Sequence, residues 1–467
     1  MPWALVRWVA VRLRTMRKSL LTLCAVAALQ APVRAQDTLQ PNTAPAPEPD
    51  YAPAACATRP GITTTADSIS IPPAPLVATP SPLRGLYVNR WAAVGQKMWQ
   101  LIDVAKRTEI NALVIDVKDD RGYVLYRSRV PLAREIGADT VAPMRAERMR
   151  AVLDTMRAHG IYPIARIVVV KDPILARKRP EWSIKRAPDG QPWLDKGGNP
   201  WIDPHHRGAW QYAVDLACEA IDLGFSEVQY DYVRFPDEQR ILTEATFPLA
   251  RGRDRASVIR DQLRFVRGSL RPFAVPITAD VFGLTTSDTT DMGIGQLWEK
   301  FIDAVDVVLP MTYPSHYARG NYGLQSPNAS PYKVIDRALR DAKRRSAGIA
   351  NAARVIPWYQ DFTLGAPRYG PAEVRAQIQA GYDNGVLDWM LWNPGSRYTV
   401  AALRPAEDRS ASAPNDRRNA GAPRPRSIPR SSRARGTAAD RHRSPGPSAA
   451  GSRESLARLP GAGSRGP

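Results

Sequence analysis

The stretch Val228-Gln-Tyr-Asp-Tyr-Val-Arg-Phe-Pro236 combines the pattern of a buried strand with two charged side chains. Its β-branched and aromatic residues predict a strand that ends at the proline. A carboxylate inside such a strand costs free energy unless it has a partner or a functional role. In an α/β barrel, strands present functional side chains at their C-terminal ends, which makes Asp231 a candidate site residue. A structural ion pair between Asp231 and Arg234 is the alternative.

Strands and helices alternate on both sides of this stretch. The predicted strands cover 84–89, 112–118, 161–170, 228–236, 275–282, 305–313, 354–360 and 388–393, and the predicted helices 95–107, 143–159, 206–223, 254–270, 294–302, 332–345 and 371–384. Eight strands alternating with helices predict an α/β fold, a (β/α)8 TIM barrel over residues 83–400. An open doubly wound sheet is one alternative, but it usually has a glycine-rich loop after the first strand, which is absent here. A smaller barrel with one strand misassigned is the other.

The two ends of the chain have the composition of export and linker segments. Residues 1–35 have a basic start, an apolar run from Leu20 to Leu29 and a small-residue site ending at Ala35, which predicts a secretory signal peptide. The apolar run is about half the ~20 residues that a membrane-spanning helix needs, although an uncleaved anchor is the alternative. Residues 36–82 are rich in Pro, Ala and Thr and predict a linker, with no later membrane span expected. The chain is therefore expected to be secreted or periplasmic, in a bacterial envelope.

The net charge of +20 is concentrated at the termini. Residues 1–35 contribute +6 and residues 401–467 contribute +9, which leaves +5 for the middle of the chain. A nucleic-acid partner is therefore not expected, because the predicted barrel has no basic stripe with interleaved aromatic residues. Residues 401–467 predict a disordered tail rich in Arg, Pro and Ser. This tail is expected either to contact anionic envelope polymers or to remain solvated.

The cysteines and histidines predict no metal site and no cofactor. The three cysteines are Cys24, Cys56 and Cys218, and neither a C-x-x-C nor a zinc-like Cys/His spacing occurs. The apolar helical pattern around Cys218 favours a buried free thiol. A disulfide between Cys56 and Cys218 is the alternative in an oxidising compartment.

Carboxylates, amides and aromatic side chains gather at the predicted C-terminal ends of the strands, which point to one mouth in a barrel. Alternation places Gln229 and Asp231 on one face of their strand, and Asp116 and Lys118 on one face of theirs. The five histidines form no metal-binding pattern, and no G-x-S-x-G motif is present. Paired carboxylates with aromatic platforms remain, and these are the residues of glycoside hydrolysis, in which one carboxyl protonates the leaving oxygen and the second attacks or activates water.

Five motifs, in this order along residues 83–397, carry a resemblance to a known family: Arg84-Gly-Leu-Tyr-Val88, Val114-Ile-Asp-Val-Lys-Asp-Asp120, Gln229-Tyr-Asp-Tyr-Val-Arg-Phe-Pro236, Ala279-Asp-Val-Phe-Gly283 and Leu309-Pro-Met-Thr-Tyr-Pro314. Together they resemble the putative glycosyl hydrolase domain family of bacterial envelope proteins, which is grouped with the TIM-barrel glycosidases. The resemblance implies a barrel fold and an activity on glycosidic bonds.

By analogy with α-amylase-like enzymes, Asp231 resembles a catalytic nucleophile. The sequence departs from those enzymes, because Gln229 stands where they have an arginine and Asp280 where they have a glutamate acid. Asp231 is therefore assigned as nucleophile or base and Asp280 as general acid, with Asp116 and Asp119 as a reserve pair. The expected substrate-binding residues are Asp116, Lys118, Asp119, Arg166, Gln229, Arg234, Tyr313, Trp358, Gln360, Trp392 and Asn393.

These expectations together describe an exported glycoside hydrolase whose partner is an envelope or extracellular polysaccharide. A non-catalytic carbohydrate-binding barrel is the first alternative, since it would use the same tryptophans. An envelope-tethering or nucleic-acid-binding protein that acts through the arginine-rich tail is a weaker one.

Overall fold

The computed structural model describes residues 62–63, 70–71 and 75–407. The expected signal peptide (1–35), most of the expected linker (36–82) and residues 408–467 of the expected tail lie outside the described residues. A short antiparallel pair, β1 (Ile62–Thr63) and β2 (Ser70–Ile71), precedes the main fold.

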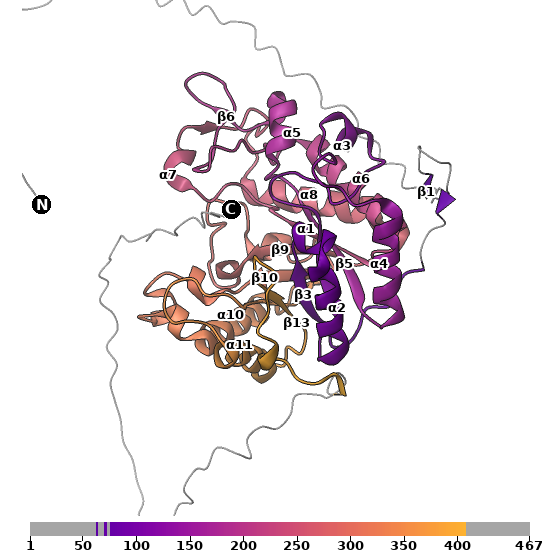
Figure 1. The fold of residues 1–467 in the computed structure, drawn as a ribbon. Coiled ribbons are helices and arrows are strands. Elements are labelled where there is room, and N and C mark those ends of the chain that lie inside the picture. Colours follow the sequence, from indigo (N-terminus) through magenta and orange to yellow (C-terminus); the bar gives the residue numbers. More distant parts are fainter. Residues whose placement is uncertain (1–61, 64–69, 72–74, 408–467) are drawn as a thin grey trace, which may run out of the picture. The chain divides into compact units, whose positions relative to one another are not determined.

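A closed parallel sheet forms the centre of the fold (Figure 1). Neighbouring strands pair in parallel all the way round, and β13 pairs with β3 to close the ring. The predicted (β/α)8 TIM barrel is confirmed, and its seventh position is shared by two short strands. The strands are β3 (Arg84–Val88), β4 (Ala112–Lys118), β5 (Tyr162–Val168), β7 (Glu227–Asp231), β9 (Ile277–Phe282), β10 (Val307–Met311), β11 (Arg354–Val355) with β12 (Trp358–Gln360), and β13 (Trp389–Trp392).

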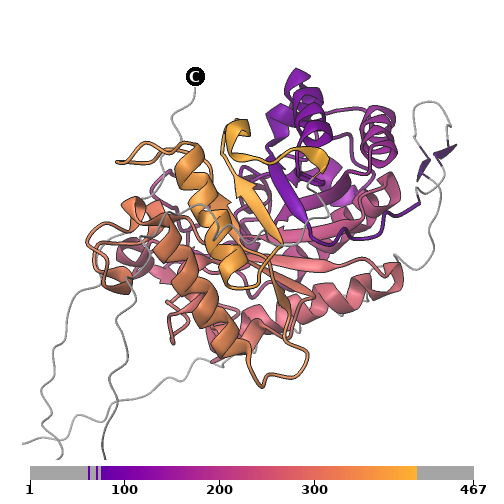
Figure 2. The ribbon, with the colours of Figure 1, turned by 90° about the horizontal axis from the view of Figure 1, so that it is seen from below.

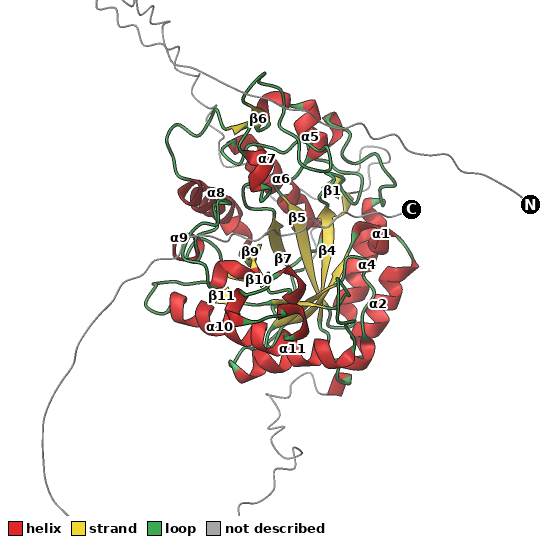
Figure 3. Cartoon of the chain, turned by 90° about the vertical axis from the view of Figure 1, so that its left-hand side faces the viewer, coloured by secondary structure: helices red, strands yellow, loops and turns green. Residues whose placement is uncertain are grey.

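Helices surround the strands, as Figures 2 and 3 show. They are α1 (Arg90–Val94), α2 (Gln96–Arg107), α3 (Pro131–Glu135), α4 (Ala146–Ala158), α5 (Pro173–Lys178), α6 (Arg207–Leu223), α7 (Gln239–Leu242), α8 (Arg255–Leu270), α9 (Trp298–Phe301), α10 (Pro331–Ser346) and α11 (Pro371–Asp383). Helix α9 is shorter than the expected 294–302, because Gly293 and Gly295 have positive φ angles and interrupt a helical start. Among the described residues, no helix is both long and apolar enough to cross a membrane.

Alternation along the strands divides the apolar side chains into two clusters. Val114, Ile164 and Leu309 belong to the smaller cluster, which fills the barrel interior. Leu113 and Ile115, on the opposite face of β4, belong to the larger cluster between strands and helices. The period of two along a strand therefore separates the barrel interior from the helix layer. Two connections, one between α5 and α6 and one between α7 and α8, contribute a small antiparallel pair, β6 (Lys185–Arg186) with β8 (Ala245–Thr246).

The folded region extends beyond both expected boundaries, residues 83 and 400. On the N-terminal side, the Val77 N–H donates to Ser226 Oγ (2.9 Å), and the Thr79 hydroxyl is hydrogen-bonded to that of Tyr162 (3.1 Å). On the C-terminal side, Ala402 is buried and the Arg404 carbonyl accepts a hydrogen bond from the Glu109 N–H (2.8 Å). Residues 401–405 are thus part of the barrel's packing rather than of a tail.

Cys218 is disulfide-bonded, which corrects the expectation of a free thiol. Its partner lies outside the described residues. The apolar pattern of α6 predicted full burial, but Cys218 lies at the margin of the buried face and is half-buried.

Candidate active site

The guanidinium group of Arg166, on β5, lies at the centre of three carboxylates at the C-terminal end of the barrel. Its Nη1 donates to Asp116 Oδ1 (2.5 Å), and its Nη2 and Nε both donate to Asp231 Oδ2, the latter at 3.2 Å. The same Nε lies 3.7 Å from Asp280 Oδ2. All four side chains are buried. The positive charge of Arg166 therefore offsets part of the negative charge of three carboxylates, whose burial without a cation would cost much free energy.

Asp280, on β9, is held on one oxygen by two neutral donors. Gln229 Nε2 (2.5 Å) and Trp358 Nε1 (2.6 Å) both donate to its Oδ1. Burial, reinforced by the negative charge of Asp231, raises the pKa of Asp280 well above its usual value. The protonated form is therefore favoured, and because Oδ1 already accepts two N–H groups, the proton belongs on Oδ2.

Tyr87, at the end of β3, is part of the cluster although the sequence analysis did not assign it to the site. Its hydroxyl donates to Asp116 Oδ2 (2.5 Å), and its ring stacks on Trp392 with 3.9 Å between ring centroids. Arg166 lies over both rings, 5.4 Å from each centroid. Burial raises the pKa of Asp116 to about 6. The inward position of Tyr87 near the C-terminal end of its strand was the signal that could have identified it. The sequence analysis missed it because this strand carries no charged residue at that end.

Three of the expected aromatic residues line the same site. Trp358 meets Trp392 edge to face at 5.9 Å, and Tyr313 lies 6.3 Å from Trp392. They come from β12, from β13 and from the residues after β10. The structure thus brings together Asp116, Arg166, Gln229, Asp231, Asp280, Tyr313, Trp358 and Trp392 from the expected set, and adds Tyr87.

Lys118 lies away from this cluster. A register shift in β4 between Asp116 and Lys118 breaks the expected alternation. From one paired position to the next, β4 advances by two residues while β5 advances by only one. The Lys118 ammonium group contacts Asp172 Oδ2 (2.8 Å) and the Val168 carbonyl (2.6 Å). It also faces the ring of Tyr212 on α6, which is in the helix layer.

Asp119 and Arg234 each bind groups in their own loop. Asp119 Oδ1 accepts the backbone N–H groups of Arg121 (3.1 Å) and Tyr123 (2.9 Å), as in a capped turn. Arg234 Nη1 lies 3.1 Å from Asp237 and faces three aromatic rings. The alternative ion pair between Asp231 and Arg234 is absent, because Asp231 is paired with Arg166 instead.

Gln360 and Asn393 bind loop backbone. The Gln360 side chain accepts the Ser315 N–H (3.0 Å) and donates to the Phe362 carbonyl (2.9 Å). Asn393 Nδ2 donates to the Asp361 carbonyl (2.6 Å), and its Oδ1 accepts the Gly395 N–H (2.9 Å). Both residues therefore shape the loops around the carboxylates.

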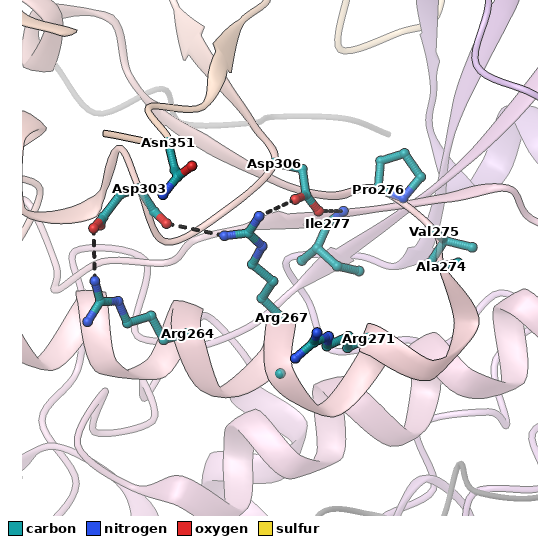
Figure 4. A pocket seen from close by; sticks show the side chains of 11 residues that line it. Arg264, Arg267, Arg271, Ala274, Val275, Pro276, Ile277, Asp303, Asp306 and Asn351 are labelled. Carbon is teal, nitrogen blue, oxygen red and sulfur yellow. Dashed lines mark hydrogen bonds and ion pairs between the residues drawn. The ribbon is translucent and has the colours of Figure 1, made fainter. Parts of the chain in front are cut away.

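A pocket of about 860 Å³ lies at the opposite end of the barrel, at the start of β9 (Figure 4). Arginines of α8 reach across it to acidic residues before β10: Arg264 Nη2 lies 2.8 Å from Asp303 and Arg267 Nη2 lies 2.6 Å from Asp306. The N-terminal face of such a barrel contributes to stability rather than to catalysis, and these ion pairs tie α8 to the segment before β10. In the described part of the chain, no group of three or more His, Cys, Asp or Glu side chains is arranged to hold a metal ion.

The fold and the carboxylate cluster define a (β/α)8 barrel protein with an acidic site at the C-terminal ends of its strands. Residues 85–398 match the model of one family, described as "Putative glycosyl hydrolase domain", and the chain belongs to that family. The resemblance expected from the sequence motifs is thereby confirmed. Among curated proteins no match was found.

Two solved structures illustrate what the chain is similar to. A hypothetical protein from Ruminiclostridium thermocellum is 36% identical, with 42% of this chain and 97% of that chain covered and a TM-score of 0.38. The glycoside hydrolase domain of PgaB (BpsB) from Bordetella bronchiseptica is 14% identical, with 67% and 94% covered and a TM-score of 0.50. At that identity the second likeness concerns the fold alone.

Proposed function

We propose that the protein is an exported glycoside hydrolase that cleaves glycosidic bonds of an envelope or extracellular polysaccharide. The observation that carries the proposal is the sharing of Arg166 by Asp231 and Asp280, with Gln229 and Trp358 holding only one oxygen of Asp280. Because the two carboxylates flank one nitrogen atom, their oxygens lie within the ~9.5 Å limit seen for catalytic pairs of glycosidases.

In the proposed reaction the two carboxyl groups have different roles. Asp280 Oδ2 donates its proton to the glycosidic oxygen as the bond to the anomeric carbon breaks. Asp231 Oδ2 accepts two N–H groups of Arg166, and as a carboxylate Asp231 either attacks the anomeric carbon or takes a proton from the attacking water. The half-buried Trp392 ring beside them, which stacks on the buried Tyr87, offers an apolar face to a sugar ring.

A screen of the full chain against bacterial polysaccharides, amino-sugar polymers included, tests this function. We expect cleavage by the parent, and a loss of about 10³-fold or more in kcat for Asp231→Asn and for Asp280→Asn. Asp154→Asn, a change of an exposed carboxylate on α4, is the matched control and should behave like the parent. Equal cleavage by the parent and both site variants would move the chemistry away from this pair.

One observation favours a carbohydrate-binding barrel without catalysis as the second candidate. Both oxygens of Asp231 are engaged, Oδ2 by Arg166 and Oδ1 by the Tyr232 N–H (2.5 Å). If a polysaccharide in the gel slows the migration of the parent in affinity electrophoresis, but the parent releases no sugar from any polymer, this second candidate replaces the first.

The disulfide at Cys218 supports the export part of the proposal, because disulfides persist in oxidising compartments. We expect that Cys218 of the protein isolated from its native compartment resists alkylation after denaturation and reacts only after reduction. Peptide mass mapping measures this. Immediate alkylation without a reductant would contradict an oxidising location.

A further inference from the structure

An aromatic cluster extends the site beyond the carboxylates. Tyr313, His316 and Phe362 contact one another, with ring centroids 5.3 Å apart for Tyr313–His316, 5.8 Å for Tyr313–Phe362 and 6.1 Å for His316–Phe362. Tyr313 also neighbours Trp392, which stacks on Tyr87 above Arg166. The rings thus form a continuous row from the carboxylates to the protein surface.

Exposure is greatest at the outer end of this row, and Trp392, between Tyr87 and Tyr313, is half-buried. Tyr87 and Tyr313 are buried, Phe362 is half-buried, and His316 is exposed. The inner rings surround the reacting groups, whereas the outer pair offers apolar ring faces to solvent. A partly exposed pair of rings continuous with a polar site is an arrangement that fits a ligand with both apolar and hydroxyl-bearing faces.

The outer rings are held in place by the buried side chain of Gln360. Its Oε1 accepts the Ser315 N–H (3.0 Å) in the loop after β10, and its Nε2 donates to the Phe362 carbonyl (2.9 Å) in the loop after β12. The Gln360 backbone is bound in turn by Gln377 of α11 at 2.8 Å. Two loops from neighbouring strands are therefore joined beneath the rings, so the platform is preorganised.

We propose that His316 and Phe362 form a sugar-binding subsite, where a pyranose ring of the polysaccharide stacks one or more positions away from the bond that is cleaved. This inference rests on the proposed function. Sugar C–H groups would pack on the ring faces while the hydroxyl groups remain solvated, and the bound ring would hold a long substrate over Asp231 and Asp280. Substrates too short to reach the rings would bind without this contact.

Chain-length dependence tests the subsite in the full-length protein. With oligosaccharides from the polysaccharide that the parent hydrolyses, Phe362→Ala should lower kcat/KM about tenfold for long substrates, chiefly through KM, and leave the shortest unchanged. Phe362→Tyr should restore the parent behaviour. Leu364→Ala removes an exposed apolar side chain (43% exposed) from the same loop and should have no effect.

Several outcomes overturn the subsite while the proposed function stands: an equal loss for all substrate lengths, no loss for any length, or the same loss for Leu364→Ala. If the parent hydrolyses nothing, retention in gels that contain soluble chitosan or xylan provides the second measurement. Weaker retention of Phe362→Ala than of the parent would then support the subsite although the hydrolase proposal had failed. Absence of any retention would overturn both.

Discussion

Arg166 is the residue on which the electrostatics of the site depend. A guanidinium keeps its charge at any pH that the fold survives, and Arg166 forms ion pairs with both Asp116 and Asp231. Asp280 receives only a longer contact from Arg166 and its strongest bonds from neutral groups. The donors are thus unequally distributed: Asp231 binds the cation directly, whereas Asp280, whose pKa is raised by burial, binds mainly neutral donors. Different environments for two carboxyl groups are what an acid and base pair requires.

The pH dependence of activity should respond to Trp358. Its Nε1 hydrogen bond stabilises the charged form of Asp280 and so lowers that pKa. Removing the donor in Trp358→Phe should therefore raise the pKa of Asp280. Because a general acid works in its protonated form, the basic limb of the pH profile of kcat/KM should move to higher pH, by about one unit or less.

Trp389→Phe is the matched control for this shift, since Trp389 is equally buried but its Nε1 bonds to Tyr382 on α11. Its profile should coincide with that of the parent. A basic limb that moves to lower pH in Trp358→Phe, or that does not move, would remove Asp280 from the role of acid.

Strand β4 shows how one irregularity redirects a charged side chain. Asp116 pairs in register with Arg166, and the shift that follows turns Lys118 out of the barrel interior towards α6. There it meets Asp172, whose other oxygen caps the start of α5 by accepting the Leu175 N–H (2.9 Å). The bulge therefore joins β4 to the loop after β5 through a buried ion pair.

Lys118→Met should lower the free energy of unfolding by about 3–5 kcal/mol, because it leaves the buried carboxylate of Asp172 without its cation. Asp120→Asn removes one partner of the partly exposed pair with Lys171 and should cost less than about 1 kcal/mol. Urea denaturation of both variants measures the difference. Similar small losses would mean that Asp172 is solvated or protonated when Lys118 is absent.

At the scale of the whole molecule, segments outside the repeating strands and helices complete the barrel. Residues 75–82 bond to the N-terminal ends of β5 and β7, and residues 401–405 bond to the segment between α2 and β4. The carboxylate of Glu109 joins this second contact, where it binds Arg84 (3.1 Å), Arg375 (3.1 Å) and the Arg404 N–H (3.0 Å). Removing residues 401–407 takes away one of these partners.

A fragment of residues 75–407 should be more stable than one of residues 83–400. The shorter fragment loses several partly buried hydrogen bonds and the packing of Ala402, and its Tm should be lower by about 5 °C or more. Differential scanning calorimetry of the two fragments checks this. Equal Tm values would show that the terminal segments contribute no net stability.

The sequence by itself determined the barrel, the order of its strands and most residues of the site. These depend on local patterns: the period of strands and helices, and the polar residues at the C-terminal ends of strands, which any parallel barrel brings to one side. Asp231, Asp280 and Asp116 could be found in this way. The family resemblance depended on the same local motifs.

Only the tertiary structure decided which of those residues meet. The register shift after Asp116 placed Lys118 in the helix layer, and the pairing of Tyr87 with Asp116 depends on two strands lying side by side. The engagement of Gln360 by two loops, and of Cys218 in a disulfide, likewise depends on segments distant in the chain. Register shifts and contacts between neighbouring strands follow from packing of the whole sheet, and a pattern read along one strand does not contain them.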